Sequence, residues 1–368
     1  MKRHIILSLA AVCSAVCSGF EPLAPGLIQD GVGRAGMIAV LLEPNDHHAT
    51  PVTLLAGGAN FPYARPGART AAERGEKVFY DEIAVMPHVL NAAPAGEAIK
   101  PLVVSKMPRP LGYAAFVGTP GGMVVAGGCN AEGHTSKVTR FELHGTELRV
   151  EALPDLPRTV AYPAFALVGN KFYVIGGQEQ ADSTTCLNCC FVLDLADVSA
   201  GWCELAPMPS GRMLAAAGVV NGVVYVMGGC SLHRDAKGQA ERTYLNDVLC
   251  YDPGSNSWAR VAGEMPEPLV GMANPLPVHA GKLYIVGGDP GVYYRASLVG
   301  QQPAEHPGQS KNIYSFTPST GEWHKEGELR QGVATLPAVR ADGVIYAISG
   351  ETHPGVRTPV INAFSVEK

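Results

Sequence analysis

Six short apolar segments, five ending in a glycine pair and the sixth in Ser-Gly, recur along the chain and constrain its fold more than any other feature. Successive second glycines are separated by 49 to 70 residues. A repeat of this length is typical of architectures in which each unit is one small element that stacks on its neighbours. The six segments end at Gly58, Gly128, Gly177, Gly229, Gly288 and Gly350.

Each repeat carries the parts of a four-stranded sheet around its glycine pair. In the fourth copy, Asn221-Gly222 separates two apolar runs, which is the strongest short signal of a β-hairpin. A third strand is expected over 246–251, and a turn at 252–254 leads to the tryptophan of a fourth strand. The tryptophans of this position are Trp202, Trp258 and Trp323, and Met-Pro-like elements follow at Met107-Pro108, Leu156-Pro157, Met208-Pro209, Met265-Pro266 and Glu328-Leu329.

A four-stranded unit of about fifty residues is the length of a kelch blade. Six copies therefore predict an all-β fold, a six-bladed kelch-type β-propeller. Hairpins packed in a sandwich are the alternative, but that arrangement does not require tryptophans in register with the repeat. Glycine suits the inner strands of a propeller, where backbones approach closely and positive φ angles occur.

The overall composition agrees with a turn-rich β protein. The 368 residues include 43 glycines and 29 prolines, which argues against a helical bundle. Hydrophobic residues make up 46%, enough for a core, so the chain is not disordered. A formal net charge of -5 offers no basic excess, and we expect no nucleic-acid partner.

The sixth repeat contains three strands of its expected four. Its last strand is expected over 360–366, close to the end of the printed sequence. Residues 20–26 resemble the fourth-strand segment 202–208, so we expect the N-terminal strand to complete the C-terminal blade and close the ring. Residues 20–368 then form a single propeller domain.

Residues 1–19 have the pattern of a secretory signal peptide. Lys2 and Arg3 precede an apolar run over 5–17 that is too short to span a bilayer. We expect a periplasmic or secreted protein without a membrane span. A lipoprotein acylated at Cys13 or Cys17 is the alternative, although valine rather than a small residue precedes each cysteine.

Four cysteines cluster at Cys186, Cys189, Cys190 and Cys203. An oxidising compartment permits disulfides, and Cys190 could face Cys203 across a hairpin. Cys186 and Cys189 also have the spacing of zinc ligands, but no second close pair of Cys or His completes such a site. The remaining three, Cys129, Cys230 and Cys250, are expected to behave as small apolar residues.

A propeller by itself specifies no activity, so functional residues are sought in its loops. Two loops stand out, at 350–358 after the sixth repeat signal and at 57–69 after the first. Arginines also enter the first strand of five blades, where a structural role between blades is the simpler interpretation. They are Arg34, Arg109, Arg158, Arg212 and Arg330.

These loops resemble segments of the bacterial sialic acid mutarotases, also called N-acetylneuraminate epimerases, which are exported six-bladed kelch proteins. The segment 350–358, Gly-Glu-Thr-His-Pro-Gly-Val-Arg-Thr, is similar to the family pattern Gly-Glu-x-x-Pro-Gly-x-Arg-Thr. The segment 56–61 resembles Ala-Gly-Gly-Ala-x-Phe, and 311–320 resembles the strand before the catalytic blade. In the best-known members the glutamate blade precedes the Gly-Gly-Ala-x-Phe blade. Here the glutamate blade is last and the other is first, so the chain resembles a cyclically permuted branch.

The resemblance implies that Glu351 is the proton acceptor and that Arg357 contacts the substrate. Asn60, Arg65 and Arg69 follow the neighbouring glycine pair and are further candidates for sugar contacts. The expected ligand is a sugar acid, N-acetylneuraminate. No cofactor and no metal are expected, and a homodimer is left open.

The chemistry of anomer interconversion suits these residue types. A cyclic hemiketal opens and recloses on its other face when a base takes the anomeric proton and an acid protonates the ring oxygen. An arginine fork is a natural clamp for the carboxylate on the anomeric carbon, and Pro354-Gly355 supplies a turn that brings Glu351 and Arg357 together.

Structural roles are the alternatives for these loop residues. Glu351 could be a solvated carboxylate or a mere ion-pair partner of Arg357. For His353 we expect an exposed loop histidine, and a second proton carrier is the alternative. The whole chain could be a non-catalytic propeller that binds a glycan or protein. A copper oxidase would need a Tyr-Cys pair with two histidines at the channel, and no such set is evident.

Overall fold

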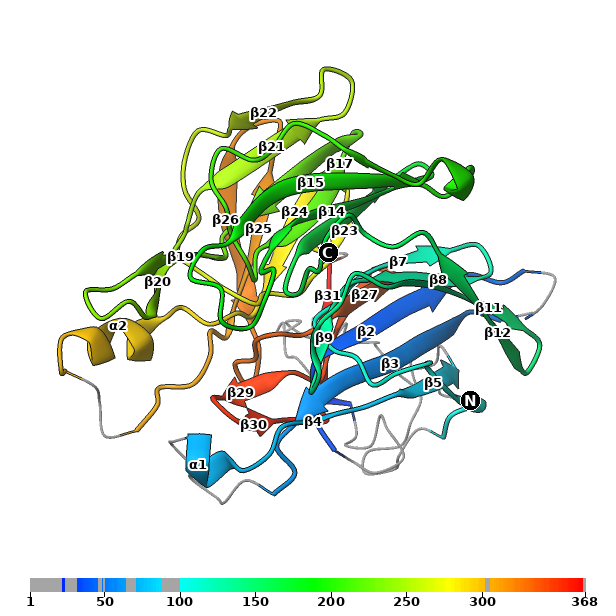
Figure 1. Cartoon of the computed structure of the whole chain (residues 1–368), viewed down its shortest axis with the longest axis horizontal. Helices are drawn as coiled ribbons and strands as arrows, with labels where there is room; N and C mark the ends of the chain where they lie inside the picture. The colour runs from blue at the N-terminus through cyan, green and yellow to red at the C-terminus, as the bar shows by residue number, and fades with distance from the viewer. Residues whose placement is uncertain are drawn as a thin grey trace, which may run out of the picture.

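Six antiparallel sheets follow one another around the molecule in chain order (Figure 1). The computed structural model describes residues 22–23, 32–45, 48, 50–63, 71–87, 100–301 and 305–366. The expected signal peptide over 1–19 and two candidate arginines, Arg65 and Arg69, lie outside the described residues. The red last sheet lies beside the blue first one, and the fold is the six-bladed β-propeller that the repeat predicts.

Each blade has four strands in up-and-down order. The first blade is β2 (Ala35–Leu42), β3 (Val52–Asn60), β5 (Glu82–Pro87) and β6 (Val103–Lys106), with β4 (Val78–Phe79) added to β3. The second is β7 (Ala115–Thr119), β8 (Gly122–Ala126), β11 (Val138–His144) and β12 (Glu147–Leu153). The third is β13 (Ala164–Val168), β14 (Lys171–Gly177), β15 (Leu187–Asp194) and β16 (Trp202–Glu204).

The later blades repeat this order. The fourth is β17 (Ala216–Val220), β18 (Val223–Met227), β21 (Val248–Asp252) and β22 (Ser257–Arg260). The fifth is β23 (Val278–His279), β24 (Lys282–Val286), β25 (Asn312–Thr317) and β26 (Glu322–Glu328). The sixth is β27 (Ala338–Ala341), β28 (Val344–Ile348), β31 (Ile361–Ser365) and β1 (Pro22–Leu23).

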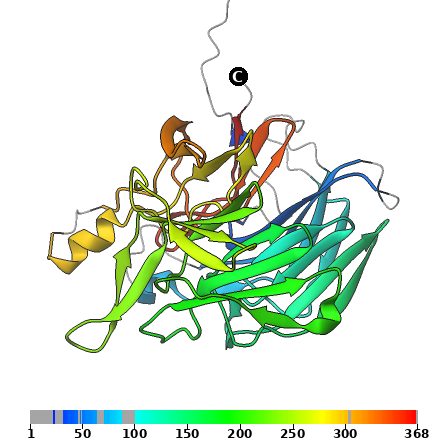
Figure 2. The ribbon, with the colours of Figure 1, turned by 90° about the horizontal axis from the view of Figure 1, so that it is seen from above.

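Small hairpins and helices project from this frame. Hairpins link the second and third strands of three blades: β9 (Cys129–Asn130) with β10 (Gly133–His134), β19 (Cys230–Arg234) with β20 (Ala240–Tyr244), and β29 (Glu351–His353) with β30 (Val356–Arg357). The helices are α1 (Ala71–Arg74), α2 (Val292–Leu298) and the 3-10 turn Val198–Ala200. In Figure 2 the gold helix α2 projects at one edge of the molecule.

The glycine pairs join neighbouring blades. The N–H of each second glycine donates to a backbone carbonyl at the entrance of the next blade, over 2.7 to 3.1 Å. The donor and acceptor pairs are Gly58–Leu111, Gly128–Val160, Gly177–Arg212, Gly229–Leu269, Gly288–Val333 and Gly350–Arg34. The last pair joins the sixth blade to the first.

Steric crowding explains why the first residue is glycine in five of the six repeats, the sixth having Ser349. A Cβ on Gly57 would lie 2.2 Å from the Leu111 oxygen, and one on Gly228 would lie 2.6 Å from the Leu269 oxygen. Both glycines also have positive φ, at 59° and 58°. The close approach and positive φ that were expected at these positions are therefore observed, and the approaching atom is a carbonyl of the next blade.

The other repeat elements lie where the sequence predicts them. Trp202, Trp258 and Trp323 all lie on the outermost strand of their blade. Trp258 donates through Nε1 to the Ala206 carbonyl of the preceding blade over 2.8 Å, so the tryptophan also links blades. Met208 is buried beneath the glycine pair of its own blade.

The sixth blade ends in a short fourth strand from the N-terminal region. Pro22 pairs with Asn362, and Leu23 pairs with Ile361, in antiparallel register. Residues 24–31 between this strand and the first blade lie outside the described part of the chain. Closure of the ring by the whole segment 20–26 therefore stays a prediction.

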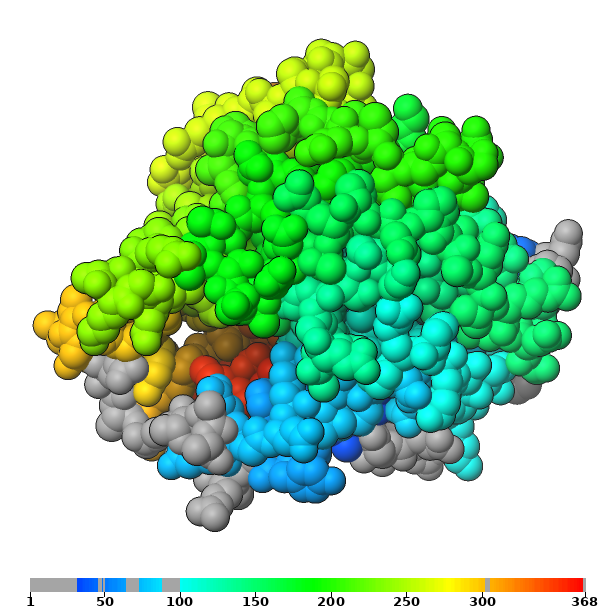
Figure 3. Space-filling model, in the orientation of Figure 1, coloured from blue at the N-terminus to red at the C-terminus, as the bar shows by residue number. Residues whose placement is uncertain are grey.

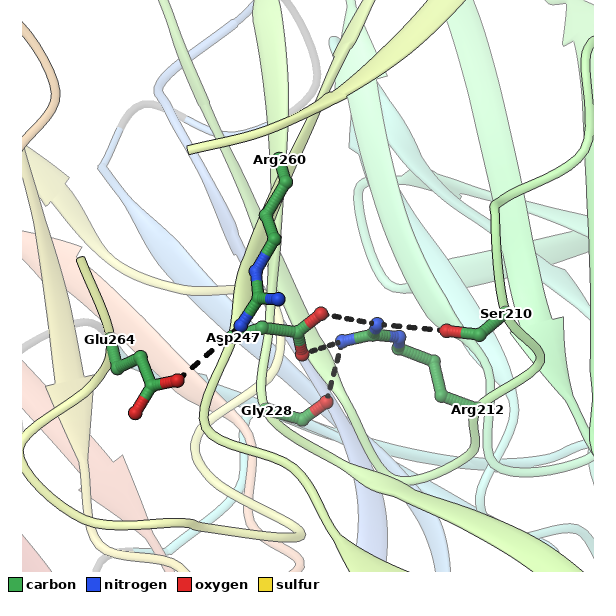
Figure 4. A network of polar contacts seen from close by, with 6 residues as sticks. All are labelled: Ser210, Arg212, Gly228, Asp247, Arg260 and Glu264. Atoms are coloured by element: carbon green, nitrogen blue, oxygen red, sulfur yellow. Dashed lines mark hydrogen bonds and ion pairs between the residues drawn. The ribbon is translucent and has the colours of Figure 1, made fainter. Parts of the chain in front are cut away.

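The arginine series divides into two groups. Arg34 and Arg212 supply the carbonyls that accept from the glycine pairs, and both side chains are 1% exposed. Arg212 pairs with Asp247 over 2.8 and 3.0 Å and donates to the Gly228 carbonyl (Figure 4). Arg34 pairs with Glu82 in the same way. These two arginines have the structural role between blades.

The other three arginines do not share that position. Arg109 is half-buried and donates to Thr135 over 3.4 Å, while Arg158 and Arg330 are exposed. The five arginines are therefore not one repeat feature, because only Arg34 and Arg212 supply the carbonyl that accepts from the glycine pair of the preceding blade.

The seven cysteines in the described part of the chain are all free thiols. Cys203 lies opposite Val192 in the β15–β16 ladder, so the strand register does not place it across from Cys190. Burial raises the pKa of Cys190 to about 12 and that of Cys189 to about 11. Cys186 is half-buried and points to the Cys230 carbonyl over 3.5 Å.

Candidate active site

A cavity of about 770 Å³ opens at one end of the central channel. Residues from all six blades line it, so it lies on the propeller axis, as ligand sites in closed β architectures commonly do. Figure 3 shows a hollow on this face, with red C-terminal residues inside it between blue and green-yellow segments. Most of the polar side chains discussed below belong to its lining.

Six backbone hydrogen bonds form a closed ring at the floor of this cavity. One residue of each blade donates its N–H to the carbonyl of the equivalent residue in a neighbouring blade, over 2.5 to 3.0 Å. All six residues have φ between 54° and 64°, although four of them are not glycine. In order around the ring they are Gly36, Tyr113, Tyr162, Leu214, Gly271 and Thr335. Left-handed non-glycine residues of this kind cluster at functional sites.

In every blade, the residue that follows the glycine pair (Ser-Gly in the sixth blade) forms an antiparallel β-bridge with the residue that precedes a member of this ring. This position therefore recurs once per blade beside the cavity, and it is the position of Glu351. Around the ring it is occupied by Ala59, Cys129, Gln178, Cys230, Asp289 and Glu351. Two carboxylates, Asp289 and Glu351, consequently come from adjacent blades and both line the cavity.

Glu351 and Arg357 meet on the β29–β30 hairpin. They are direct partners in the strand register, and Arg357 Nη2 lies 3.1 Å from Glu351 Oε2. The other carboxylate oxygen accepts the Gly355 N–H over 2.9 Å. Gly355 has φ of 85°, which this tight turn requires. The Pro354-Gly355 turn thus brings the predicted base and the predicted substrate contact together.

The guanidinium of Arg357 is buried but only partly used. Its side chain is 3% exposed, and its Nε and Nη1 have no hydrogen-bond partner among the described residues. The group lies over the Phe61 ring, with 5.0 Å between Cζ and the ring centroid. Arg357 lines the cavity, and buried polar groups are normally satisfied, so the unused donors of its guanidinium indicate a site for an acceptor.

Asn60 does not line the cavity. Its side-chain oxygen accepts the Phe61 N–H over 2.6 Å, and the residue is 9% exposed. The next residue, Phe61, lines the cavity in its place. The role of Asn60 in sugar binding stays a prediction, as do those of Arg65 and Arg69 outside the described residues.

His353 belongs to the β29–β30 hairpin but does not line the cavity. Its Nδ1 is 3.3 Å from Thr352 Oγ1, and its ring packs against His306 with 5.6 Å between centroids. Burial lowers the pKa of His306, and the neighbouring His353 lowers it further, against the opposing charge of Asp289. The expectation of an exposed loop histidine is therefore wrong, because His353 is half-buried in this stack.

Sequence reasoning missed the cavity residue Asp289 and its hydrogen-bond partner Tyr244, which come from other blades. Asp289 accepts hydrogen bonds from the Tyr244 hydroxyl and the Gly291 N–H, each over 2.8 Å. Burial and the Asp289 charge hold the pKa of Tyr244 well above its ordinary value. The signal for Asp289 was available, because it follows a glycine pair as Glu351 follows Ser349-Gly350. No local signal marks Tyr244.

The first and second blades contribute a lysine and a histidine, each packed against an aromatic ring. Lys77 from the segment after α1 lies over the Tyr113 ring, with 4.4 Å from Nζ to the centroid. His134 packs edge-on against Tyr162 with its Nδ1 3.2 Å from the Gln178 carbonyl. Burial lowers the pKa of His134, so this imidazole is neutral at pH 7.

A Tyr-Cys pair lies at the floor of the cavity. Cys129 Sγ donates toward the Tyr162 hydroxyl over 3.7 Å, and burial raises the pKa of that hydroxyl well above its ordinary value. Within the described ranges, no group of three or more His, Cys, Asp or Glu side chains is placed to hold a metal ion. Among these residues we likewise find no helix long and apolar enough to cross a membrane.

Curated relatives of the chain are named N-acetylneuraminate epimerase. The protein of Haemophilus influenzae (strain PittEE) is 31% identical over 229 residues, which are 56% of this chain and 58% of the relative. That of Pasteurella multocida (strain Pm70) is 28% identical over 228 residues, 56% and 57% of the two chains. The relative from Escherichia coli O9:H4 (strain HS) is 30% identical over 193 residues, 46% and 50%. The chain thus spans little more than half the length of the curated relatives it matches.

These relatives confirm the family resemblance drawn from the loop motifs. A solved structure titled "Structure of YjhT" matches with a TM-score of 0.49 and 24% identity, over 58% of this chain and 65% of that one. The family model described as the KLHDC2/KLHL20/DRC7 Kelch-repeats domain matches residues 114–350, more than half of the chain. The chain therefore belongs to the kelch-repeat propeller family.

Proposed function

We propose that this protein is an isomerase that interconverts the α and β anomers of N-acetylneuraminate. The observation that carries the proposal is the buried ion pair of Glu351 and Arg357 at the cavity, with two nitrogens of the arginine left without a partner. A carboxylate and a donor for a second carboxylate lie on one hairpin. Sugar acids with a carboxylate on the anomeric carbon present a hydroxyl to Glu351 and a carboxylate to Arg357.

The proposed reaction starts when Glu351 takes the proton of the anomeric hydroxyl. The bond between the anomeric carbon and the ring oxygen breaks, and the ring oxygen takes up a proton, which gives the open-chain keto acid. Rotation about the next carbon–carbon bond exposes the other carbonyl face, and the reverse proton transfers reclose the ring. A positioned base of this kind contributes about 10²–10⁴-fold in rate.

Arg357 holds the substrate carboxylate during these steps. Charge-assisted hydrogen bonds to a guanidinium are short and directional, so they fix the anomeric carbon relative to the base. The Phe61 ring under Arg357 limits the directions the guanidinium can take. Glu351 is already within reach of the same ligand because the two side chains are neighbours.

The names of the curated relatives support the substrate class. Their collinear matches cover little more than half of each chain, as expected if the blades follow in a permuted order. Blades one and six stay neighbours in a ring under such a permutation, so the Phe61 and Glu351 loops still meet at one cavity. The N-terminal pattern over 1–19 supports export to the periplasm or secretion as part of the same proposal.

The test is an anomer assay by proton NMR. N-acetylneuraminate released by a sialidase starts as the α anomer, and added protein should speed its conversion to the β anomer. Neutral hexoses are run beside it, and their mutarotation should not respond. Binding of the sugar acid without any rate effect would favour the non-catalytic glycan-binding propeller, and equal acceleration of the hexoses would contradict the substrate class.

A further inference from the structure

A second arginine shares the aromatic ring on which Arg357 lies. Arg74, the last residue of α1, has its Cζ 5.8 Å from the Phe61 centroid, and the Arg357 Cζ lies 5.0 Å from the same centroid. Both guanidinium groups line the cavity. Two like charges that share one ring repel each other, so the pair is favoured only with negative charge beside it.

Packing against the catalytic turn holds Arg74 in place. A Cβ on Gly355 would lie 2.3 Å from Arg74 Cδ, so the side-chain stem of Arg74 lies directly on the Pro354-Gly355 turn. That turn also sets Glu351 through the Gly355 N–H. Arg74 is therefore fixed relative to both Glu351 and Arg357, although it comes from another blade.

The charges at this end of the cavity do not balance. Arg74 Nε is buried without a hydrogen-bond partner, and no carboxylate within the described ranges forms an ion pair with Arg74. Glu351 pairs with Arg357, and Asp289 accepts from Tyr244 and Gly291. One carboxylate thus faces two guanidinium groups, of which Arg357 is buried and Arg74 partly buried, and burying charge without a partner is costly.

We propose that Arg74 is a second carboxylate-binding residue, which together with Arg357 makes the cavity select sugar acids over neutral sugars. This inference rests on the proposed function for the identity of the ligand. The carboxylate lies between the two guanidinium groups, receives N–H donors from both, and supplies the negative charge that this end of the cavity lacks. Glu351 then needs only to keep its place on the hairpin and act on the anomeric hydroxyl.

Equilibrium binding to the full chain tests the inference separately from catalysis. Isothermal titration calorimetry is run with N-acetylneuraminate and with its methyl ester, which has the same shape without the charge. The proteins are the unmodified chain, Arg74→Gln, Arg74→Lys and, as a matched control, Arg158→Gln at an exposed arginine outside the cavity. Arg74→Lys keeps the charge if Arg74→Gln folds poorly.

Arg74→Gln should raise the Kd for the acid about 10- to 100-fold, the range for losing hydrogen bonds to a charged group. It should leave the Kd for the ester unchanged, and Arg74→Lys should fall in between. Arg158→Gln should match the unmodified chain. An unchanged Kd for the acid in Arg74→Gln, or equal weakening of acid and ester, would overturn the inference.

The two proposals fail in different ways. If the unmodified chain prefers the acid through Arg74 but does not speed anomer conversion, the proposed activity is wrong and the carboxylate site stands. If the chain speeds conversion and Arg74→Gln binds the acid as before, the activity stands and the role of Arg74 is wrong.

Discussion

Glu351 and Arg357 are direct partners across the β29–β30 hairpin, and their side chains form an ion pair of 3.1 Å at the cavity. Strand pairing fixes the spacing of the two residues, because each has its side chain on the same face of a two-stranded ladder. The Gly355 N–H fixes the second oxygen of the carboxylate. A short hairpin therefore brings the two groups together, and Phe61 and Arg74 of the first blade pack against them.

Glu351→Gln should abolish most of the rate enhancement. Glutamine keeps the size of the side chain and an oxygen for the Gly355 N–H, but it is not a base at neutral pH. We expect the enzyme-dependent rate of α-to-β conversion to fall by about 10²–10⁴-fold, measured by proton NMR. Glu328→Gln, at an exposed glutamate on the outer strand of the fifth blade, is the control and should keep full activity. Unaltered conversion by Glu351→Gln would assign the base to another residue.

The Arg212–Asp247 pair should matter for stability. Asp247→Ala leaves an arginine that is 1% exposed without its carboxylate, and breaking such a pair costs about 3–5 kcal/mol. We expect a loss of this size in the free energy of unfolding, measured by urea denaturation.

An exposed pair in the same region gives the matched control. Arg260 and Glu264 lie 3.4 Å apart near Asp247 in Figure 4, but both side chains are more than half exposed. Glu264→Ala should change the free energy of unfolding by less than about 1 kcal/mol. Equal losses in the two variants would contradict the structural role assigned to Arg212.

Gly228→Ala should weaken the contact between the fourth and fifth blades. The added Cβ would lie 2.6 Å from the Leu269 carbonyl oxygen, in a backbone with φ of 58°. Gly238→Ala is the control, since its φ is also positive, at 79°, but its Cβ would meet no atom within 4 Å. The control should lose about 1–2 kcal/mol for the left-handed backbone alone.

The loss in Gly228→Ala should exceed that in the control, because the backbone of the next blade must move as well. Urea denaturation of both variants measures the difference. If the two variants lose the same free energy, the glycine pair is required for its φ angles and not for the approach of neighbouring blades.

Most of the fold could be predicted because its signals are local. The glycine pairs, the Asn221-Gly222 turn and the in-register tryptophans each report on one blade, and repetition supplies the architecture. The hydrogen bond from each second glycine to the next blade could not be predicted, since its acceptor is a backbone carbonyl that any residue supplies. This is why Arg34 and Arg212 were grouped with three arginines that do not share their position.

The sequence predicted only those site residues that lie close together along the chain. Glu351 and Arg357 belong to one hairpin, so their spacing and the Pro354-Gly355 turn were enough. Arg74 and Asp289 enter the cavity from two other blades, and Tyr244, which donates to Asp289, comes from a third. Their meeting depends on the angular order of the blades around the axis, which no short segment encodes.

Acid should destabilise the protein through His134. Burial holds the pKa of this imidazole below its ordinary value of 6.5, so the unfolded chain takes up its proton first as the pH falls. The contribution of His134 is therefore complete above about pH 6.5 and is lost as the pH falls through its lower folded-state pKa. His134→Gln removes the pH-dependent contribution of His134 to the free energy of unfolding. The contribution of His306, whose pKa is also lowered by burial, remains. Urea denaturation between pH 7.5 and pH 5 should accordingly show a smaller loss of unfolding free energy in His134→Gln than in the unmodified chain. If the unfolding free energies of the two proteins fell equally with pH, His134 would have the same pKa in the folded and the unfolded chain.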